Sequence, residues 1–402
     1  MVGWQRRQLS TEEWGDEVRM RGRALWMAVI AVVVAFAVAG CGSATGVEAQ
    51  KGPVADRAKA AGKRAAQEAG GRTKVPGANV VLLLMNGSEE SSARLKVEIT
   101  HLGKVKLGWT PSPCDGKGDA KALEMCAIGV IDQGPADFII SNGVPPKDMS
   151  RILKKAFFKK IPVINIAATV APSGLFAASY TPDDGAQSAK LNKYMIKRLM
   201  RLPEEDRKIV VLSSSTGGGS ARFRQLKSDI QGTGIQIVDE AQADQAKSAT
   251  DKETVTKLLE KHPDVKGVWL AQGSSVGPAG DAVDKAFKNL AFPERPLVVG
   301  FNADPKAAAA IRDGKADAVS DVAYDATLYI ALDQIAENLG RQKPLAKDVQ
   351  EAGYPLDFLD IALVTRDDAP EKGKFRDPKE DFVSFFTSKW RREFGSPPKA
   401  GG

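Results

Sequence analysis

Short apolar segments alternate with helical segments along most of the chain. Residues 79–86 read NVVLLLMN, an almost continuous apolar run that ends in a polar residue, which is typical of a strand buried on both faces. Further strands are predicted at 136–142, 161–167, 207–215, 235–241, 267–273, 296–302 and 317–323. Helical spacing of apolar residues predicts helices at 91–108, 148–160 and 252–261. This alternation predicts the α/β class, with parallel sheets that carry helices on both faces.

The N-terminal segment has the layout of a secretory signal. A basic region precedes an apolar run, residues 24–39, of about 16 residues, whereas a membrane-spanning helix needs roughly 20. The run ends in VAGC, which resembles the bacterial lipobox, so we predict a lipoprotein signal peptide over 1–40 and lipidation of Cys41. An uncleaved anchor helix is the alternative, and both place the rest of the chain outside the cytoplasm. Acidic residues within 12–17 are unusual in a signal, and Met20 would be a more typical start.

Residues 41–77 are rich in glycine, alanine and charge and contain no aromatic side chain. Such a segment buries too little apolar surface to offset the entropy of ordering it. We therefore predict a flexible tether, helical in part at most, that holds the folded body away from the bilayer.

The remaining chain is longer than a single core usually grows, so two domains are expected. The formal net charge of the whole sequence is +7, and acidic and basic residues are interspersed. No basic stripe with aromatic residues stands out, which argues against a nucleic-acid partner.

Cysteine and histidine are too scarce to indicate metal or catalytic chemistry. Cys114 and Cys126 would meet an oxidising environment outside the cytoplasm, where they could form a disulfide worth about 3 kcal/mol or remain two buried thiols. Together with His101 and His262 they give no zinc spacing, so no metal or other cofactor is expected. Neither histidine follows a predicted strand and no nucleophile elbow is present, so no catalytic residues are assigned.

Polar and small residues follow most of the predicted strands. These segments are 86–90, 141–143, 213–220, 272–274 and 302–304. Ligands of parallel α/β sheets bind beyond the carboxyl ends of the strands, although helix caps have a similar composition. The pattern suits a small polar ligand that is uncharged or weakly charged. Gly217 to Gly219 lack the Gly-Lys-Ser/Thr of a phosphate-binding loop and are interpreted as a flexible strand-to-helix turn.

Several stretches resemble the type I periplasmic-binding-protein family, especially its ribose/galactose-binding and lac-repressor-like branch. They are LGWT with DGKGD in 107–119, IPVI at 161–164, SARFR at 220–224, HPDVKGVWLAQ at 262–272, VVGFN at 298–302 and the segment 313–321. The resemblance covers about residues 77–366. It implies two doubly wound parallel-sheet lobes joined by a three-crossing hinge, with a ligand between them.

The resemblance also implies the domain boundaries. The expected parts are an N-terminal lobe of 78–182 plus 323–348, a C-terminal lobe of 183–322 plus 349–366, and a C-terminal linker and amphipathic helix within 367–402. Aromatic residues lie along one helical face of 378–394. We expect this helix to dock on its own domain, and docking on a membrane is the alternative.

Seven side chains on the strand-end loops and near the last crossing are candidate ligand-binding residues. They are Glu89, Glu90, Asn142, Arg222, Gln272, Asn302 and Asp321. The resemblance implies that Arg222 donates a paired hydrogen bond to ligand hydroxyls. It further implies that Asn302 replaces the usual acceptor aspartate and that Asp321 makes a polar contact near the crossing.

Two departures from sugar-binding members change the expected ligand. Ser91 to Ala93 stand where those members place stacking aromatic residues, and Ala167 and Ala168 stand where they often carry an Asp-Arg pair. We therefore expect a sugar or sugar-like molecule, or a ligand with an amine for Glu89 or Glu90. Phe176, Tyr180 or Phe223 could supply stacking, although core packing is the commoner use of such residues.

The combined features predict a monomeric, non-enzymatic solute-binding protein, anchored to the membrane by its lipid, that delivers its ligand to an ABC permease. Closure of the hinge on the ligand would be the mechanism. A receptor of the same fold that feeds a membrane signalling protein is the alternative, and an extracytoplasmic hydrolase is a third interpretation.

Overall fold

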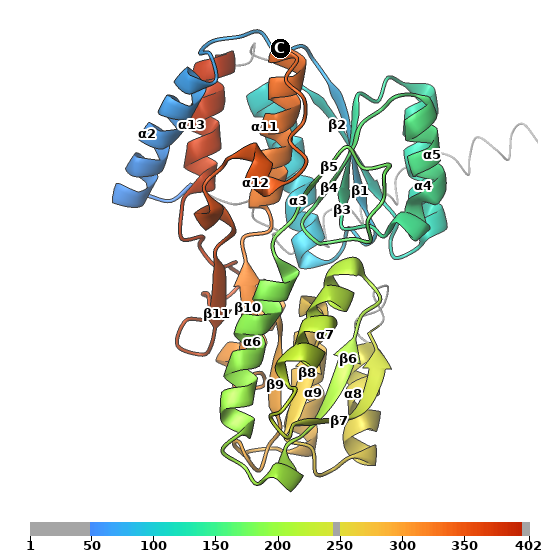
Figure 1. Cartoon of the computed structure of the whole chain (residues 1–402), viewed down its shortest axis with the longest axis vertical. Coiled ribbons are helices and arrows are strands. Elements are labelled where there is room, and N and C mark those ends of the chain that lie inside the picture. The colour runs from blue at the N-terminus through green and yellow to red at the C-terminus, as the bar shows by residue number, and fades with distance from the viewer. Residues whose placement is uncertain (1–48, 244–249, 396–402) are drawn as a thin grey trace, which may run out of the picture. The chain divides into compact units, whose positions relative to one another are not determined.

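The computed structural model describes residues 49–243 and 250–395, which belong to one compact unit of the chain (Figure 1). The predicted signal peptide, Met20 and Cys41 lie outside the described residues. None of the described helices combines the length and the apolar character that a bilayer crossing requires.

The first sheet is parallel and has the strand order β2-β1-β3-β4-β5. Its strands are β1 (Asn79–Leu84), β2 (Thr110–Asp115), β3 (Phe138–Asn142), β4 (Val163–Ile166) and β5 (Ala178–Tyr180). Side chains of β1 alternate between two cores, which explains why this strand is apolar throughout: Val80 and Leu82 face one core, and Val81 and Leu83 face the other. Helices α3 (Glu90–His101) and α11 (Ala326–Arg341) cover the first face, and α4 (Ala120–Gln133) and α5 (Ser150–Phe158) cover the second.

The second sheet has the order β11-β10-β9-β8-β6-β7 and is parallel except for β11. Its strands are β6 (Lys208–Ser213), β7 (Gln236–Gln242), β8 (Gly267–Leu270), β9 (Leu297–Phe301), β10 (Ala318–Val322) and β11 (Ile361–Val364). Helices α6 (Asp184–Leu199) and α7 (Gly217–Asp229) pack on one face, and α8 (Asp251–Lys261), α9 (Val276–Ala286) and α10 (Pro305–Arg312) pack on the other. The predicted fold of two parallel-sheet lobes is therefore confirmed.

Short helices occupy several connections. They are η1 (Leu102–Leu107), η2 (Pro146–Met149), η3 (Glu204–Asp206), η5 (Gly273–Ser275), α12 (Val349–Ala352) and η6 (Leu356–Leu359). Cys114 in β2 and Cys126 in α4 are joined by a disulfide. Of the two alternatives predicted from the sequence, a disulfide or two buried thiols, the disulfide is confirmed.

The chain passes between the two sheets after β5, after β10 and after η6, as the three-crossing hinge requires. The third passage differs from the expected boundary at residue 349. Val349 and Phe358 lie in the core of the first sheet, together with Tyr329 of α11, because their apolar side chains find partners there. The passage therefore lies near residue 360. Residues beyond β11 then return to the first core, which adds a fourth passage.

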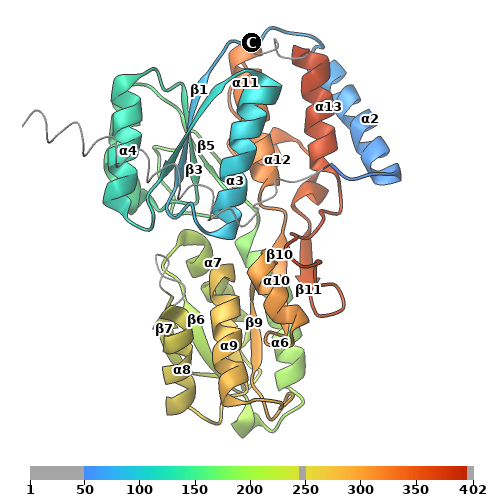
Figure 2. The ribbon, with the colours of Figure 1, turned by 180° about the vertical axis from the view of Figure 1, so that it is seen from behind.

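Two terminal helices form an additional layer on the first lobe. Helix α2 (Pro53–Glu68) lies against α13 (Phe382–Phe394), and both views show them side by side (Figure 2). The buried positions of α2 are Ala55, Ala58, Gly62 and Ala66. A Cβ at Gly62 would lie 2.1 Å from the carbonyl oxygen of Phe385, so this glycine permits the close approach. The prediction of a flexible tether is therefore wrong for 53–68, because a distant helix supplies the apolar partner that this segment lacks.

The aromatic face of α13 docks on the protein's own first lobe, as expected. Its buried residues include Phe382, Phe385, Phe386 and Trp390. The ring of Tyr329 in α11 stacks on Trp390 with centroids 5.9 Å apart and an interplanar angle of 5°. Rings of this kind bury large apolar areas, so α13 is part of the first core.

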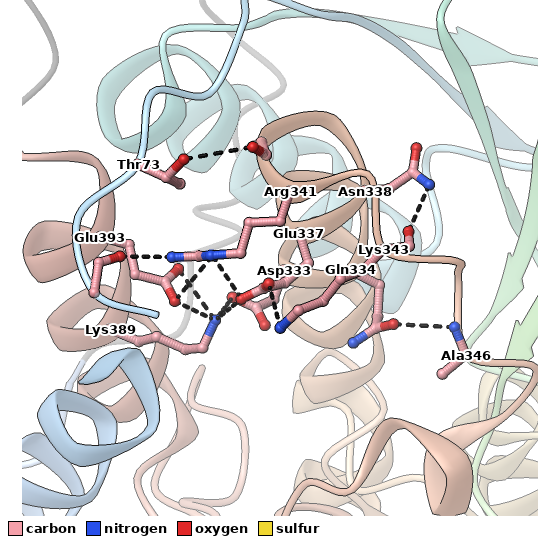
Figure 3. A network of polar contacts seen from close by, with 12 residues as sticks. Thr73, Asp333, Gln334, Glu337, Asn338, Arg341, Lys343, Ala346, Lys389 and Glu393 are labelled. Atoms are coloured by element: carbon pink, nitrogen blue, oxygen red, sulfur yellow. Dashed lines mark hydrogen bonds and ion pairs between the residues drawn. The ribbon is translucent and has the colours of Figure 1, made fainter. Parts of the chain in front are cut away.

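A buried ionic network fixes α13 to α11 (Figure 3). The Lys389 ammonium, 3% exposed, donates to Asp333 at 2.8 Å, to Glu337 at 2.9 Å and to Glu393 at 3.1 Å. Burial alone would lower the pKa of Lys389, but Asp333 and Glu393 raise it above its ordinary value. Arg341 adds a second cation, 3.0 Å from Glu337, so the network balances its carboxylates with basic side chains.

Candidate functional site

A cavity of about 410 Å³ lies where loops from the carboxyl ends of both sheets come together. The first sheet contributes the loops that follow β1, β3 and β4. The second sheet contributes those that follow β6, β8 and β9, and the passage after β10 closes the lining. The position agrees with the general rule for ligand sites of parallel α/β sheets.

The cavity brings together most of the side chains predicted from the sequence. Glu89, Glu90, Asn142, Arg222, Gln272 and Asn302 all line it. Asp321 is not among the lining residues. Its carboxylate accepts hydrogen bonds from the Ala303 N–H at 2.7 Å and from the Arg376 guanidinium at 2.7 Å. It therefore fixes the loop after β9 to the segment that follows β11, and the structure does not bring it into the lining that the other six predicted residues share.

The guanidinium of Arg222 is largely occupied by the protein. Its Nε donates to Asp184 at 2.9 Å, and its terminal nitrogens donate to Gln187 at 2.9 Å and to the Ala271 carbonyl at 3.1 Å. It also lies over the ring of Phe301, 4.4 Å from the centroid. The expected paired hydrogen bond to a ligand is therefore unfavourable in this arrangement. Arg222 instead holds α6, α7 and the end of β8 together beneath the cavity.

The amide side chains differ in what they have available for a ligand. The Asn142 amide donates to the Ser92 hydroxyl at 3.2 Å. The Gln272 Nε2 group is buried and has no hydrogen-bond partner among the residues that the structure describes. Asn302 adopts a positive φ of 59°, a conformation that asparagine tolerates better than most residues, and its N–H donates to the Ser320 carbonyl. Gln272 therefore offers an unused donor at the cavity.

Two further lining residues were not selected from the sequence, Asp304 and Tyr324. Asp304 is 8% exposed, and its Oδ1 has no hydrogen-bond partner in the described part of the chain. Tyr324 is 6% exposed, and its hydroxyl also lacks a partner among those residues. An aspartate before Pro305 is expected to cap the next helix, yet Asp304 makes no capping bond. Tyr324 follows the end of β10, so the strand-end rule would have found it.

Asp304 and Glu89 at the cavity hold their protons more tightly than usual. Burial raises the pKa of Asp304 to about 8, and Asp321, Glu90 and Glu89 add to the rise while Arg94 opposes it. Burial also raises the pKa of Glu89 to about 7. Both groups resist ionisation because the site is desolvated and carries several like charges.

The glycine run at the start of α7 is helical and not a turn. Thr216 caps this helix by accepting from the Gly219 N–H at 3.2 Å, and the helix begins at Gly217. A Cβ at Gly217 would lie 2.1 Å from the carbonyl oxygen of Thr169. The glycine is therefore needed for close approach between the loop after β4 and the first turn of α7.

No stacking platform of the kind considered from the sequence lines the cavity. Phe176 and Tyr180 belong to cores of the first sheet, and Phe223 packs near Trp269. Tyr324 is the aromatic residue among the described lining side chains. Within the described ranges, no group of three or more His, Cys, Asp or Glu side chains is arranged to hold a metal ion.

Comparisons with known proteins agree with this architecture. Residues 121–343 match the model of the periplasmic binding protein domain. Curated proteins gave no match.

Solved structures of similar fold include a galactofuranose binding protein, with 18% identity and a TM-score of 0.63 over 73% of this chain and 96% of that chain. The myo-inositol binding protein of Caulobacter, bound to myo-inositol, has 17% identity and a TM-score of 0.61 over 73% of this chain and 95% of its own. An ABC transporter solute binding protein from Mycobacterium smegmatis, with bound glycerol, has 20% identity and a TM-score of 0.60 over 75% of this chain and 100% of its own.

Those identities indicate a shared fold, and the family match spans more than half of the sequence. Its members are solute-binding proteins and not enzymes. The chain therefore belongs to the periplasmic binding protein family.

Proposed function

We propose that this protein is an extracytoplasmic, lipid-anchored solute-binding protein that captures one small polar molecule, a sugar or a sugar-like compound, and delivers it to an ABC importer. The observation that carries the proposal is the set of buried polar atoms without a partner among the described residues, on the lining residues Gln272, Asp304 and Tyr324. Leaving a buried polar atom unpaired costs about 1–3 kcal/mol, so several such atoms in one cavity favour a site that a ligand completes.

The comparisons support a ligand of this class. The similar folds include proteins named for binding galactofuranose and myo-inositol, and one named as an ABC transporter solute binding protein. The cavity volume of about 410 Å³ suits a molecule of that size. A ring of amide, hydroxyl and carboxylate groups provides directional contacts for several hydroxyls.

The proposed mechanism is stabilisation of a closed arrangement by contacts from both lobes. The Glu90 carboxylate in α3 already accepts a hydrogen bond from the Lys306 N–H in α10 at 2.9 Å. A ligand that contacts Glu89 on the first lobe and Gln272 on the second adds further links between the same loops. Because such contacts exist only when both loops face the ligand, binding favours the closed state, which the permease would recognise.

A thermal-shift screen of the purified chain against sugars, polyols, amino acids and amines tests the binding proposal. A ligand at a hundredfold excess over its dissociation constant adds about 2.7 kcal/mol of stability. Gln272→Ala should weaken the hit, because it removes an unpartnered donor. The matched control is Gln231→Ala, at an exposed position remote from the cavity lining. A screen without any stabilising compound contradicts the proposal.

Anchoring and delivery need separate tests. Labelled fatty acid should enter the wild-type chain in bacterial cells, and Cys41→Ser should abolish its incorporation. Cells that lack the gene should lose uptake of the identified ligand and recover it with the wild-type gene. Binding without any effect on uptake would contradict the transport role while leaving the binding role intact.

A further inference from the structure

The charges that line the cavity do not balance. Glu89, Glu90 and Asp304 contribute carboxylates, whereas Arg222 and Lys306 contribute cations. Arg222 is already neutralised, because its guanidinium forms an ion pair with the buried Asp184 at 2.9 Å. Lys306 is exposed, so solvent weakens its effect on the cavity. The cavity therefore offers a ligand more acidic groups than free basic groups.

Asp304 is the carboxylate for which a ligand would most clearly supply a missing hydrogen-bond partner. It is 8% exposed, no described residue forms a hydrogen bond with its Oδ1, and its side chain does not cap α10. The nearby cation Arg94 is engaged elsewhere, because it pairs with Asp325 and with Glu98 and lies over the ring of Phe375. Within residues 49–243 and 250–395, no side chain or backbone N–H donates to this oxygen, and no cation is dedicated to it.

Glu89 provides a second carboxylate from the opposite lobe. It occupies the N-cap position of α3, yet its side chain makes no capping hydrogen bond. Burial and, after it, the nearby Asp251 raise the pKa of Glu89, and Lys306 opposes that rise only in part. A hydroxyl could donate one hydrogen bond to either group, but it carries no charge that would stabilise the ionised carboxylate. A protonated amine supplies both the donors and the charge.

We propose that the cavity selects a small polyhydroxylated ligand that carries a protonated amine, which binds to Asp304 and Glu89 while its hydroxyls contact Gln272 and Tyr324. This inference rests on the proposed binding function and names the ligand class of that same site. The hydroxyls follow from the polar neutral groups on the lining, and the amine follows from its uncompensated carboxylates. The absence of lining aromatic rings other than Tyr324 among the described residues also favours ionic over stacking recognition.

Calorimetric titration of the purified chain with matched sugars tests the inference. The probes are D-glucosamine and D-galactosamine, their neutral parents D-glucose and D-galactose, and the N-acetyl derivatives, which keep the bulk of the substituent but lose its charge. At least one amine should bind about tenfold to a hundredfold more tightly than its neutral parent and its N-acetyl form, as a charge-assisted hydrogen bond predicts. A neutral parent that binds as tightly as the amine overturns the inference.

Variants test whether the preference for the amine comes from direct contacts with Asp304 and Glu89. Asp304→Asn keeps the shape of the side chain and should remove most of the preference for the amine, and Glu89→Gln provides a second, independent test. Asp281→Asn is the control, because Asp281 pairs with Lys315 away from the cavity. Unchanged amine preference in both cavity variants overturns the inference. If every probe fails to bind while a neutral polyol stabilises the chain in the thermal-shift screen, the inference fails but the proposed binding function stands. If the screen also yields no stabilising compound, both fail.

Discussion

Replacing Asp304 by asparagine should stabilise the ligand-free protein at neutral and alkaline pH. The two side chains have the same shape, and Asp304 makes no capping bond that the substitution would remove. What changes is the cost of ionising a buried group that faces Asp321, Glu90 and Glu89, with Arg94 as the opposing cation. Asparagine does not carry that cost.

The magnitude follows from the pKa of Asp304, which burial raises from 3.8 to about 8. Between these values the folded state keeps a proton that the unfolded chain has lost. The free energy of unfolding therefore falls as pH rises, by about 1.4 kcal/mol per pH unit for one proton. The stability contributed by the neutral carboxyl is fully present below about pH 4 and is lost as pH rises through about 8.

Over the whole window the loss is on the order of 5 kcal/mol, and this is an upper bound because water can enter and loops can relax around the ionised group. We expect Asp304→Asn to match the wild type at low pH and to exceed its stability by at least about 2 kcal/mol near pH 8.

Urea unfolding at several values between about pH 5 and about pH 8 measures this difference. The control is Asp281→Asn, whose native carboxyl has a lowered pKa because Lys315 donates a hydrogen bond to it. That group is ionised in both states across the range, so its substitution should shift the stability curve without changing its slope. Parallel curves for wild type and Asp304→Asn would refute the reasoning, since they would mean that Asp304 does not take up a proton on folding.

Two predictions concern the terminal layer. Lys389→Met removes the cation that three buried carboxylates share, and it should lower the free energy of unfolding by about 3–5 kcal/mol. Lys343→Met is the control at a half-exposed lysine, and it should lower the free energy of unfolding by about 1 kcal/mol or less. Urea unfolding measures both. Gly62→Ala places a methyl group 2.1 Å from the Phe385 carbonyl oxygen. It should lower the free energy of unfolding by about 1–3 kcal/mol and make α2 accessible to protease. Gly129→Ala is the control in a helix with open space around the glycine, and it should be neutral or stabilising. Equal effects within either pair would contradict the packing described for α2 and α13.

The sheets could be predicted because their local sequence pattern reports burial directly. The strand at Asn79–Leu84 is apolar at every position after the first, and the structure places it inside its sheet, between β2 and β3, with a core on each face. The packing of α2 could not be predicted in the same way. Its small residues acquire a core only by contact with α13, at the other end of the chain, and no local pattern contains that information.

For the candidate site, too, the sequence predicted only part of what the structure shows. The strand-end rule located the loops of Glu89, Asn142 and Gln272 because the carboxyl ends of parallel strands share one edge of each sheet. It could not tell which polar atoms the protein already satisfies. The guanidinium of Arg222 is bound to protein groups, whereas one oxygen of Asp304 has no partner in the described ranges. Only the three-dimensional hydrogen-bond pattern distinguishes the two.

The buried carboxyl groups that lower the stability of the ligand-free protein can also make its binding selective. Asp304 and Glu89 retain protons near neutral pH because each lies in a desolvated, acidic environment. A ligand amine that pairs with them lowers the cost of their ionisation, so part of its binding energy comes from relieving an unfavourable state of the protein. A neutral molecule of the same shape gains only its hydrogen bonds. Because Glu89 begins α3 and Asp304 precedes α10, the same ion pairs would also link the two lobes. Ligand selection and lobe closure would then depend on one set of contacts.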